Sequence, residues 1–368
     1  MSERVRSFLP IFFQGDQNTE AHRTDHVELP EWASDLQKIN YLPEKLIIAE
    51  PLSYCAGVVR ANKAADEMLT AYQGQPVSFY HAPIHNETQL TKWENQGATV
   101  VNSLDEIPEG VPVLFSAHGV YPEIWFEAKK KHLKVVDATC PLVEKTHREV
   151  RQLRDEGYTI LLVGHKNHDE IVGTFGEAPD NIVVVHPRMT KEELDIVFEG
   201  LKDTEKVALR SQTTLALADL LEMVEYIKSK RPDINLPKKS DICYATENRQ
   251  KAVVEVIGKA GADLMIIFGS DETKRTPSSN SMRLRDVAQD MGVKAYLVED
   301  VWEIQAEWFS GARRIGISAG ASAAPERVME FLLVMMTIGL QNNQIEKIVV
   351  TEESQVFAPA KTFDFSNG

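Results

Sequence analysis

Three cysteines are the residues of this sequence with the clearest chemical potential, and Cys140 has the most informative surroundings. It follows an apolar run and precedes Pro141, which suits the first position of a helix because its missing N–H would be unpaired there. A thiol at a helix N-terminus, with Lys145 and His147 close behind, is expected to favour its thiolate form. The sequence therefore predicts a metal ligand or a nucleophile at Cys140.

The number of cysteines narrows the chemistry without deciding it. The other two are Cys55 and Cys243. Four cysteines would close a 4Fe-4S cluster, whereas three leave one iron open for an oxygen or sulfur atom of a substrate. A zinc ion held by three sulfurs and one histidine is an alternative, and three buried thiols that act as small hydrophobic groups are another. These alternatives stay open on the residues alone.

A weak internal repeat surrounds the cysteines, which lie 85 and 103 residues apart. Each one precedes a helical pattern and a basic residue five or six positions later; the bases are Arg60, Lys145 and Arg249. The spacing is close to the length of one small α/β domain. Three similar domains that each contribute one cysteine to a shared centre are therefore expected.

Histidines, a carboxylate and a hydroxyl-rich tract supply a second group of candidates. His85, His118, His165 and His168 follow or adjoin apolar runs, and imidazoles can hold a diphosphate even in an acidic protein. The tract PSSNS at 277–281 fits either an anion cradle or an ordinary N-cap loop before a helix at 282–291. Glu170, two residues after His168, fits a proton donor, although most glutamates are solvated surface charges.

Composition excludes several classes of function. The formal charge is −15, which argues against a sequence-independent nucleic-acid surface. The longest apolar run, 328–340, contains Glu330 and is shorter than the roughly 20 residues of a membrane span, so a buried helix is expected there. Three cysteines are too few for a disulfide scaffold and favour a reducing cytoplasm.

The elements that must position these residues follow an α/β pattern. Short apolar runs alternate with amphipathic stretches, and most runs are continuous, as in parallel strands covered on both faces. Ligands of parallel sheets bind beyond the carboxyl ends of the strands, where Thr213 precedes a predicted helix. The predicted strands are 45–50, 77–82, 111–119, 134–140, 159–165, 181–186, 206–212, 263–270, 295–300 and 314–320.

Nine motifs in order resemble one known family. They are CAGVVRA (55–61), IHN (84–86), FSAHGV (115–120), DATCPLVEKTHREV (137–150), GHKNHDEIVGTFG (164–176), SQTTL (211–215), DICYATENRQKAV (241–253), SSNS (278–281) and AGASAAP (319–325). Together they resemble the LytB/IspH family of 4-hydroxy-3-methylbut-2-enyl diphosphate reductases. The resemblance runs in register from about residue 45 to about residue 340.

The resemblance implies three similar small α/β domains in a pseudo-threefold arrangement around a central iron-sulfur cluster. It implies a 4Fe-4S cluster with one open iron site and the ligands Cys55, Cys140 and Cys243. The implied diphosphate ligands are His85, His118, Ser278, Ser279, Asn280 and Ser322, and the implied neighbours of the substrate hydroxyl are His168, Glu170 and Thr213. The family makes isopentenyl and dimethylallyl diphosphate, the last step of the methylerythritol phosphate route, with an external electron donor such as a ferredoxin or flavodoxin.

The expected division is an N-terminal extension over 1–44, α/β domains over 45–139, 140–240 and 241–345, and a C-terminal tail over 346–368. Departures from the family pattern are a longer loop at 271–277, Met282 where asparagine is common, and PLSYC before the first helix. Two other readings are a zinc-binding hydrolase and a catalytically inactive homologue that binds a phosphate ligand.

Overall fold

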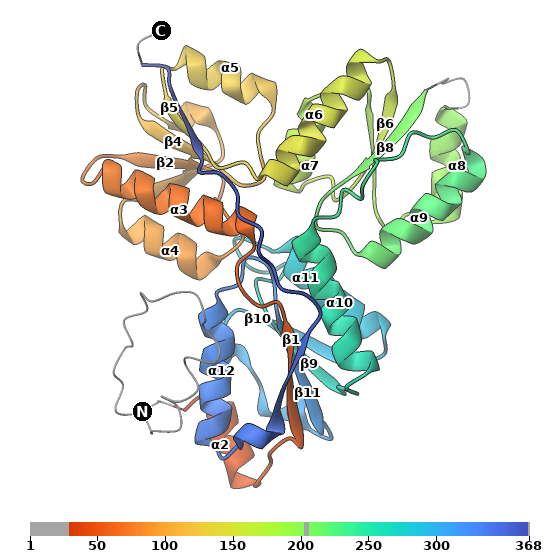
Figure 1. The fold of residues 1–368 in the computed structure, drawn as a ribbon. Coiled ribbons are helices and arrows are strands. Elements are labelled where there is room, and N and C mark those ends of the chain that lie inside the picture. Colours follow the sequence, from red (N-terminus) through yellow and green to blue (C-terminus); the bar gives the residue numbers. More distant parts are fainter. Residues whose placement is uncertain (1–28, 202–205, 367–368) are drawn as a thin grey trace.

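The computed structural model describes residues 29–201 and 206–366, and it confirms the α/β class. Figure 1 shows three units of helices and strands around a common centre. All ten apolar runs form strands, usually one to four residues shorter than predicted because the chain turns at the polar groups that end them. Three further strands, which sequence reasoning missed, lie at sheet edges.

The first unit contains a sheet in the order β13-β5-β4-β2-β3. Helix α3 covers it, and Val58 and Ala61 pack in one cluster with Phe79 and Leu114. The elements are α3 (Ala56–Ala71), β2 (Val77–Tyr80), α4 (Glu87–Asn95), β3 (Ala98–Val101), β4 (Pro112–Phe115), α5 (Pro122–Lys130), β5 (Lys134–Asp137) and β13 (Lys361–Asp364). Only β13 runs antiparallel to its neighbour.

The second unit has the smallest sheet, in the parallel order β7-β6-β8. Leu161 and Leu162, which point to opposite faces of β6, are both fully buried, in agreement with a strand covered on both faces. The elements are α6 (Pro141–Asp155), β6 (Thr159–Val163), α7 (Asp169–Gly176), β7 (Ile182–Val185), α8 (Lys191–Gly200), β8 (Val207–Ser211) and α9 (Leu217–Lys230).

The third unit contains a five-stranded parallel sheet in the order β10-β9-β11-β1-β12. The predicted buried helix is α12, which packs Phe331 and Met335 into its core. The elements are α2 (Glu31–Lys38), β1 (Lys45–Glu50), α10 (Tyr244–Gly258), β9 (Leu264–Phe268), α11 (Ser279–Asp290), β10 (Lys294–Val298), β11 (Arg314–Ala319), α12 (Pro325–Thr337) and β12 (Ile345–Val349). No helix within residues 29–201 and 206–366 has the length and apolar character of a membrane span.

Strand pairing does not follow the expected division of the chain. Sequence reasoning placed 45–50 in the first domain, but β1 pairs with β11 and β12 of the third sheet. The chain then crosses to the first unit through the loop that carries Cys55. We propose that the domain boundaries follow the sheets, so that β1 and β12 belong to the third domain.

Part of the expected N-terminal extension belongs to the core. Residues 1–28 lie outside the described part of the chain, but Trp32 of α2 is 3% exposed. Its ring stacks on Phe309 and Phe331, with centroids 5.4 and 5.8 Å apart, and its Nε1–H donates to the Val301 carbonyl. The expected N-terminal extension therefore includes a helix that packs in the core, which the sequence did not reveal because an eight-residue helix offers too short a pattern to recognise.

The expected tail binds two units together. After β12 it crosses beside α3 and ends as β13 on the first sheet (Figure 1). On the way, Glu353 lies 3.1 Å from the fully buried guanidinium of Arg249, and the Ala358 carbonyl accepts from Arg60 Nε at 2.9 Å. The tail is therefore part of the fold on both sides of the centre.

Replacing Glu353 with alanine should lower the free energy of unfolding by about 3–5 kcal/mol, because the buried charge of Arg249 loses its partner. Urea unfolding followed by circular dichroism measures this change. Glu352→Ala is the matched control, since Glu352 is the exposed neighbour on the same segment. An equal midpoint for the two variants would contradict the assignment.

Candidate functional site

Each of the three cysteines is the N-cap residue of a helix that points toward the centre of the molecule. The helices are α3, α6 and α10. The strand-to-helix junction predicted at Cys140 is confirmed, because β5 ends at Asp137 and α6 begins at Pro141. Backbone hydrogen bonds fix all three cysteines: Cys55 N–H donates to the Ala321 carbonyl, Cys140 N–H to Ala117 and Cys243 N–H to Thr213.

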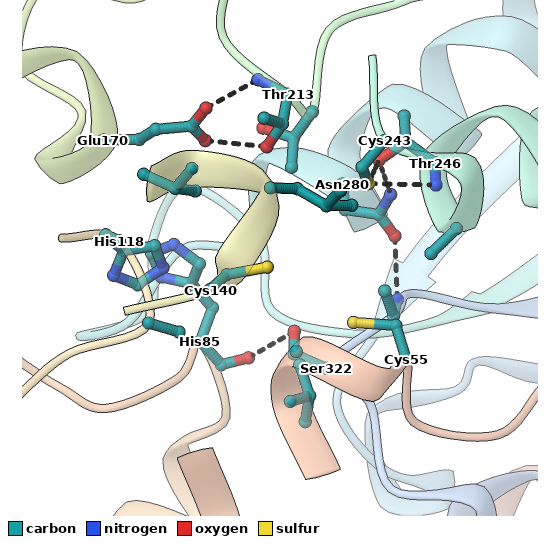
Figure 2. Close-up of a pocket in the computed structure, with 18 of the residues that line it drawn as sticks. Cys55, His85, His118, Cys140, Glu170, Thr213, Cys243, Thr246, Asn280 and Ser322 are labelled. Atoms are coloured by element: carbon teal, nitrogen blue, oxygen red, sulfur yellow. Dashed lines mark hydrogen bonds between the residues drawn. The ribbon is translucent and has the colours of Figure 1, made fainter. Parts of the chain in front are cut away.

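The three thiols line one central cavity of about 760 Å³ including its mouth. Figure 2 shows the sulfurs of Cys55 and Cys140 directed into it. A Cβ atom added to Gly57 would lie 3.0 Å from the Cys140 sulfur and 3.7 Å from the Cys55 sulfur, so only glycine fits between them without movement. The first turn of α3 thus lets two thiols from different helices approach the same space.

The donors are not arranged around a single ion. Among residues 29–201 and 206–366, no three His, Cys, Asp or Glu side chains have the placement to hold one metal ion. A tetrahedral zinc site needs all of its ligands within about 2.0–2.3 Å of one point. An iron-sulfur cluster takes each thiolate on a different iron, so separated thiols around one cavity fit a cluster better than zinc.

The expectation that local cations favour the Cys140 thiolate is wrong. Lys145 lies 3.3 Å from Asp241 and 3.4 Å from Glu149, and the His147 ring lies 3.0 Å from Glu177. Burial, together with the nearby Cys55 thiol, raises the pKa of Cys140 to about 12. Thiolates in this cavity therefore require a positively charged partner inside it, which a bound metal could supply.

Glu170 lies across the cavity from the cysteines and is 3% exposed. Its carboxylate accepts two hydrogen bonds from Thr213, one from the backbone N–H at 2.7 Å and one from the hydroxyl at 3.0 Å (Figure 2). Burial raises the pKa of Glu170 to about 7, although these hydrogen bonds oppose the shift. A carboxyl with this pKa can give up a proton near neutral pH, as a general acid must.

Three imidazoles form a cluster on one side of the cavity. The His85 ring centroid lies 4.2 Å from that of His118 and 5.4 Å from that of His168. Burial lowers the pKa of all three, to about 3, 4 and 3 in the order named, so the rings are neutral in the empty site. Nε2 of His85 and Nε2 of His168 are buried without a hydrogen-bond partner, which indicates a missing polar ligand.

Hydroxyl and amide groups at helix N-termini line the remaining wall. Helix α11 begins at Ser279, three residues earlier than predicted, because Ser278 caps it and accepts from the Ser281 N–H. The Ser322 hydroxyl donates to the His85 carbonyl at 2.9 Å and connects this wall to the imidazoles. Backbone amides and hydroxyls at a helix N-terminus bind anions such as phosphate.

One polar chain that the sequence did not predict reaches the third cysteine. Asn280 Nδ2 donates to the Thr246 hydroxyl at 2.9 Å, and that hydroxyl lies 3.1 Å from the Cys243 sulfur (Figure 2). Thr246 N–H also points at this sulfur, at 3.4 Å. The sequence did contain a signal for this contact. Thr246 lies three residues after Cys243, and the backbone N–H at that position usually donates to the side chain of the N-cap residue.

The structure brings together around this cavity all twelve site residues that the family resemblance implies. They are Cys55, His85, His118, Cys140, His168, Glu170, Thr213, Cys243, Ser278, Ser279, Asn280 and Ser322. His165, which sequence reasoning considered with His168, instead lies in a neighbouring cleft, where its ring contacts His186. Thr246, Tyr244 and Phe357 line the cavity and were not predicted.

Comparison with known protein families gives one match over most of the chain. The family model described as LytB protein matches residues 46–336. A 4-hydroxy-3-methylbut-2-enyl diphosphate reductase of Acidothermus cellulolyticus is 41% identical over 319 residues, which cover 86% of this chain and 89% of the relative. The enzyme of the same name from Streptomyces coelicolor is 40% identical over 318 residues, which cover 86% of this chain and 90% of that relative.

Solved structures give a consistent result. The E-1-hydroxy-2-methyl-but-2-enyl-4-diphosphate reductase from Plasmodium falciparum superposes with a TM-score of 0.79 at 31% identity, over 86% of this chain and 96% of that one. A structure described as (E)-4-hydroxy-3-methyl-but-2-enyl diphosphate reductase, the terminal enzyme of the non-mevalonate pathway, matches at 35% identity with a TM-score of 0.55. It covers 80% of this chain and 99% of that one.

Proposed function

This chain belongs to the LytB protein family, and we propose from that premise that it reduces 4-hydroxy-3-methylbut-2-enyl diphosphate to isopentenyl and dimethylallyl diphosphate. The observation that carries the proposal is the pair Glu170 and Thr213, which faces three cysteines across one buried cavity. The site therefore combines a proton donor, metal ligands and anion-binding groups within reach of one small molecule.

The family uses iron and sulfur, and the residues of the cavity fit a 4Fe-4S cluster. Cys55, Cys140 and Cys243 would hold it, because their sulfurs line one space and need a cationic partner there. Such a cluster supplies electrons and, at the iron that no cysteine holds, a Lewis acid. The Thr246 hydroxyl and N–H, which point at the Cys243 sulfur, would stabilise its thiolate.

The reaction consumes two electrons and two protons. The allylic C–O bond breaks, the hydroxyl leaves as water, and a new C–H bond forms at either end of the allyl group. Glu170 supplies the proton that turns the hydroxyl into a leaving water, since its raised pKa keeps it protonated in a large fraction of molecules near neutral pH. Thr213 holds the Glu170 carboxyl in place through its hydrogen bonds. His168 is the N-cap residue of α7, the helix that carries Glu170.

The diphosphate end of the substrate requires groups that can neutralise negative charge. We assign it to His85, His118, Ser278, Ser279, Asn280 and Ser322, with His168 and Thr213 nearer the hydroxyl end. The unpartnered Nε2 of His85 and the N-terminus of α11 support this assignment.

The electrons come from an external protein such as a ferredoxin or flavodoxin. The three free cysteines support a reducing cytoplasm as its location.

The experiment that tests the function is purification without oxygen, followed by incubation with the substrate and a chemical one-electron reductant. Mass spectrometry should detect isopentenyl and dimethylallyl diphosphate, and the protein should be brown with an absorption band at about 400 nm. A colourless protein that contains zinc would instead support a zinc-binding hydrolase. A brown, iron-loaded protein that makes neither product would refute the proposed reaction and leave an inactive phosphate-binding homologue.

A further inference from the structure

Asp169 lies beside the cavity but belongs to a second, adjoining space. This cleft has a volume of about 1880 Å³ including its opening and shares His85, His168 and Ser279 with the central cavity. It therefore leads from the surface to the diphosphate end of the site. Asp169 and His81 line the cleft only, and no role has been assigned to either of them above.

The Asp169 carboxylate contacts two imidazoles from the first unit. One oxygen lies 2.8 Å from His81 Nδ1, which is a hydrogen bond, and the other lies 3.9 Å from His118 Nδ1. The Ser116 hydroxyl lies 3.3 Å from that same His118 nitrogen. These contacts occupy the Nδ1 side of His118, so its Nε2 side is the one available to a phosphate.

His81 holds its place through an uncommon backbone conformation. Its φ is +62°, in the left-handed region that few residues other than glycine adopt. Its N–H donates to the Val101 carbonyl at 3.0 Å, which fixes the turn that follows β2. Non-glycine residues in this region occur often at functional sites, where the surrounding structure holds them.

The charges around Asp169 give it a distinct electrostatic role. The ionisable groups that act on it are the imidazoles His81, His85 and His118, and they hold its pKa well below the ordinary range although burial opposes the shift. Its charge in turn raises the pKa of His85, His118 and His168 against the effect of burial. Among the groups that act on these three rings, Asp169 is the acid that all of them share.

We propose that Asp169, together with His81, is a positioning residue of the diphosphate site that stabilises the protonated imidazoles formed when the substrate binds. This inference rests on the proposed function only in the identity of the substrate, because any diphosphate would place the same charge there. The incoming negative charge draws protons onto buried rings that are neutral when the site is empty. Asp169 lowers the cost of that uptake, while its bond to His81 limits repulsion of the ligand.

Asp169→Asn should weaken binding with little effect on the chemical step. We expect KM to rise about 10-fold or more, the order expected for a charge-assisted contact, with kcat changed less than about twofold. KM should increase with pH as the imidazoles lose the protons that bind the diphosphate. Because the variant lowers the pKa of the imidazoles further, this increase should begin at a lower pH than in the native enzyme. Asp169→Glu should restore part of the loss.

Calorimetry of inorganic diphosphate binding to the iron-loaded enzyme separates this role from a structural one. Titrations in two buffers of different ionisation enthalpy give the number of protons taken up, which should fall in Asp169→Asn and in His81→Asn. Asparagine tolerates the left-handed backbone at position 81. Asp195→Asn, which removes a carboxylate from the surface pair with Lys230, is the control.

Unchanged proton uptake and affinity in Asp169→Asn and His81→Asn would overturn this inference. If the enzyme fails to reduce the proposed substrate while proton uptake with inorganic diphosphate still depends on Asp169, the proposed reaction fails and the role of Asp169 stands. If the substrate is reduced and both variants bind diphosphate like the native enzyme, the proposed reaction stands and the role of Asp169 fails.

Discussion

Replacing Glu170 with glutamine should lower turnover by about 10²–10⁴-fold, the usual contribution of a general acid. Glutamine keeps the size of the side chain and can still accept the Thr213 N–H, so the cavity should keep its shape. It cannot donate a proton to the leaving hydroxyl. Steady-state rates with a chemical reductant, measured beside the visible spectrum, test both parts of the prediction.

The pH dependence gives this prediction a second readout. The pKa of Glu170 is about 7, so the protonated fraction, and with it kcat at saturating substrate, should fall as pH rises through that value. The decline should be absent in Glu170→Gln, which has no carboxyl to titrate. Glu192→Gln, at an exposed position on α8, is the control and should keep the native profile. Native rates in Glu170→Gln with an intact spectrum would exclude the carboxyl from catalysis.

Replacing Cys140 with serine should abolish the bound cluster. Its sulfur approaches Gly57 of α3 more closely than the Cys55 sulfur does, and the N-terminus of its helix, α6, is directed at the cavity. Serine offers a hard oxygen and loses its proton far less readily than cysteine, so the site loses one of its three soft donors. Iron content and absorption at about 400 nm should fall to background after anaerobic reconstitution.

The control for this variant is Thr139→Ser, which changes the neighbouring buried side chain and leaves all three sulfurs in place. It should reconstitute like the native protein. Far-ultraviolet circular dichroism of Cys140→Ser should remain native, because the β5 to α6 junction is held by backbone bonds such as Cys140 N–H to the Ala117 carbonyl. A Cys140→Ser protein that binds native amounts of iron would remove Cys140 from the ligand set.

Local features of the site could be predicted from the sequence because each depends on a few neighbouring residues. A strand that ends in small polar groups, a cysteine and then Pro141 determine the junction at Cys140 almost by themselves. The same local logic places Thr213 after β8 and Glu170 in the first turn of α7. The nine motifs in their order then indicate which of these residues form one site.

Properties that depend on distant residues could not be predicted in this way. The acidity of Cys140 depends on burial and on Cys55, which is 85 residues away, and the charge of Lys145 is paired with the distant Asp241. The partner of Arg249 is Glu353, in a segment without a clear strand pattern. The sheet that contains β1 is fixed by pairing with β11, more than 250 residues later, and no local signal encodes it.

The path of the C-terminal segment has a consequence for the order of folding. Strand β13 completes the sheet of the first unit, yet it is made more than 220 residues after its partner β5. The sheet therefore receives this strand only after its other four strands have been synthesised, and contacts of such large sequence separation form slowly. The wall of the cavity that includes Phe357 would therefore close late, after the three cysteines that the proposed cluster needs have all been synthesised.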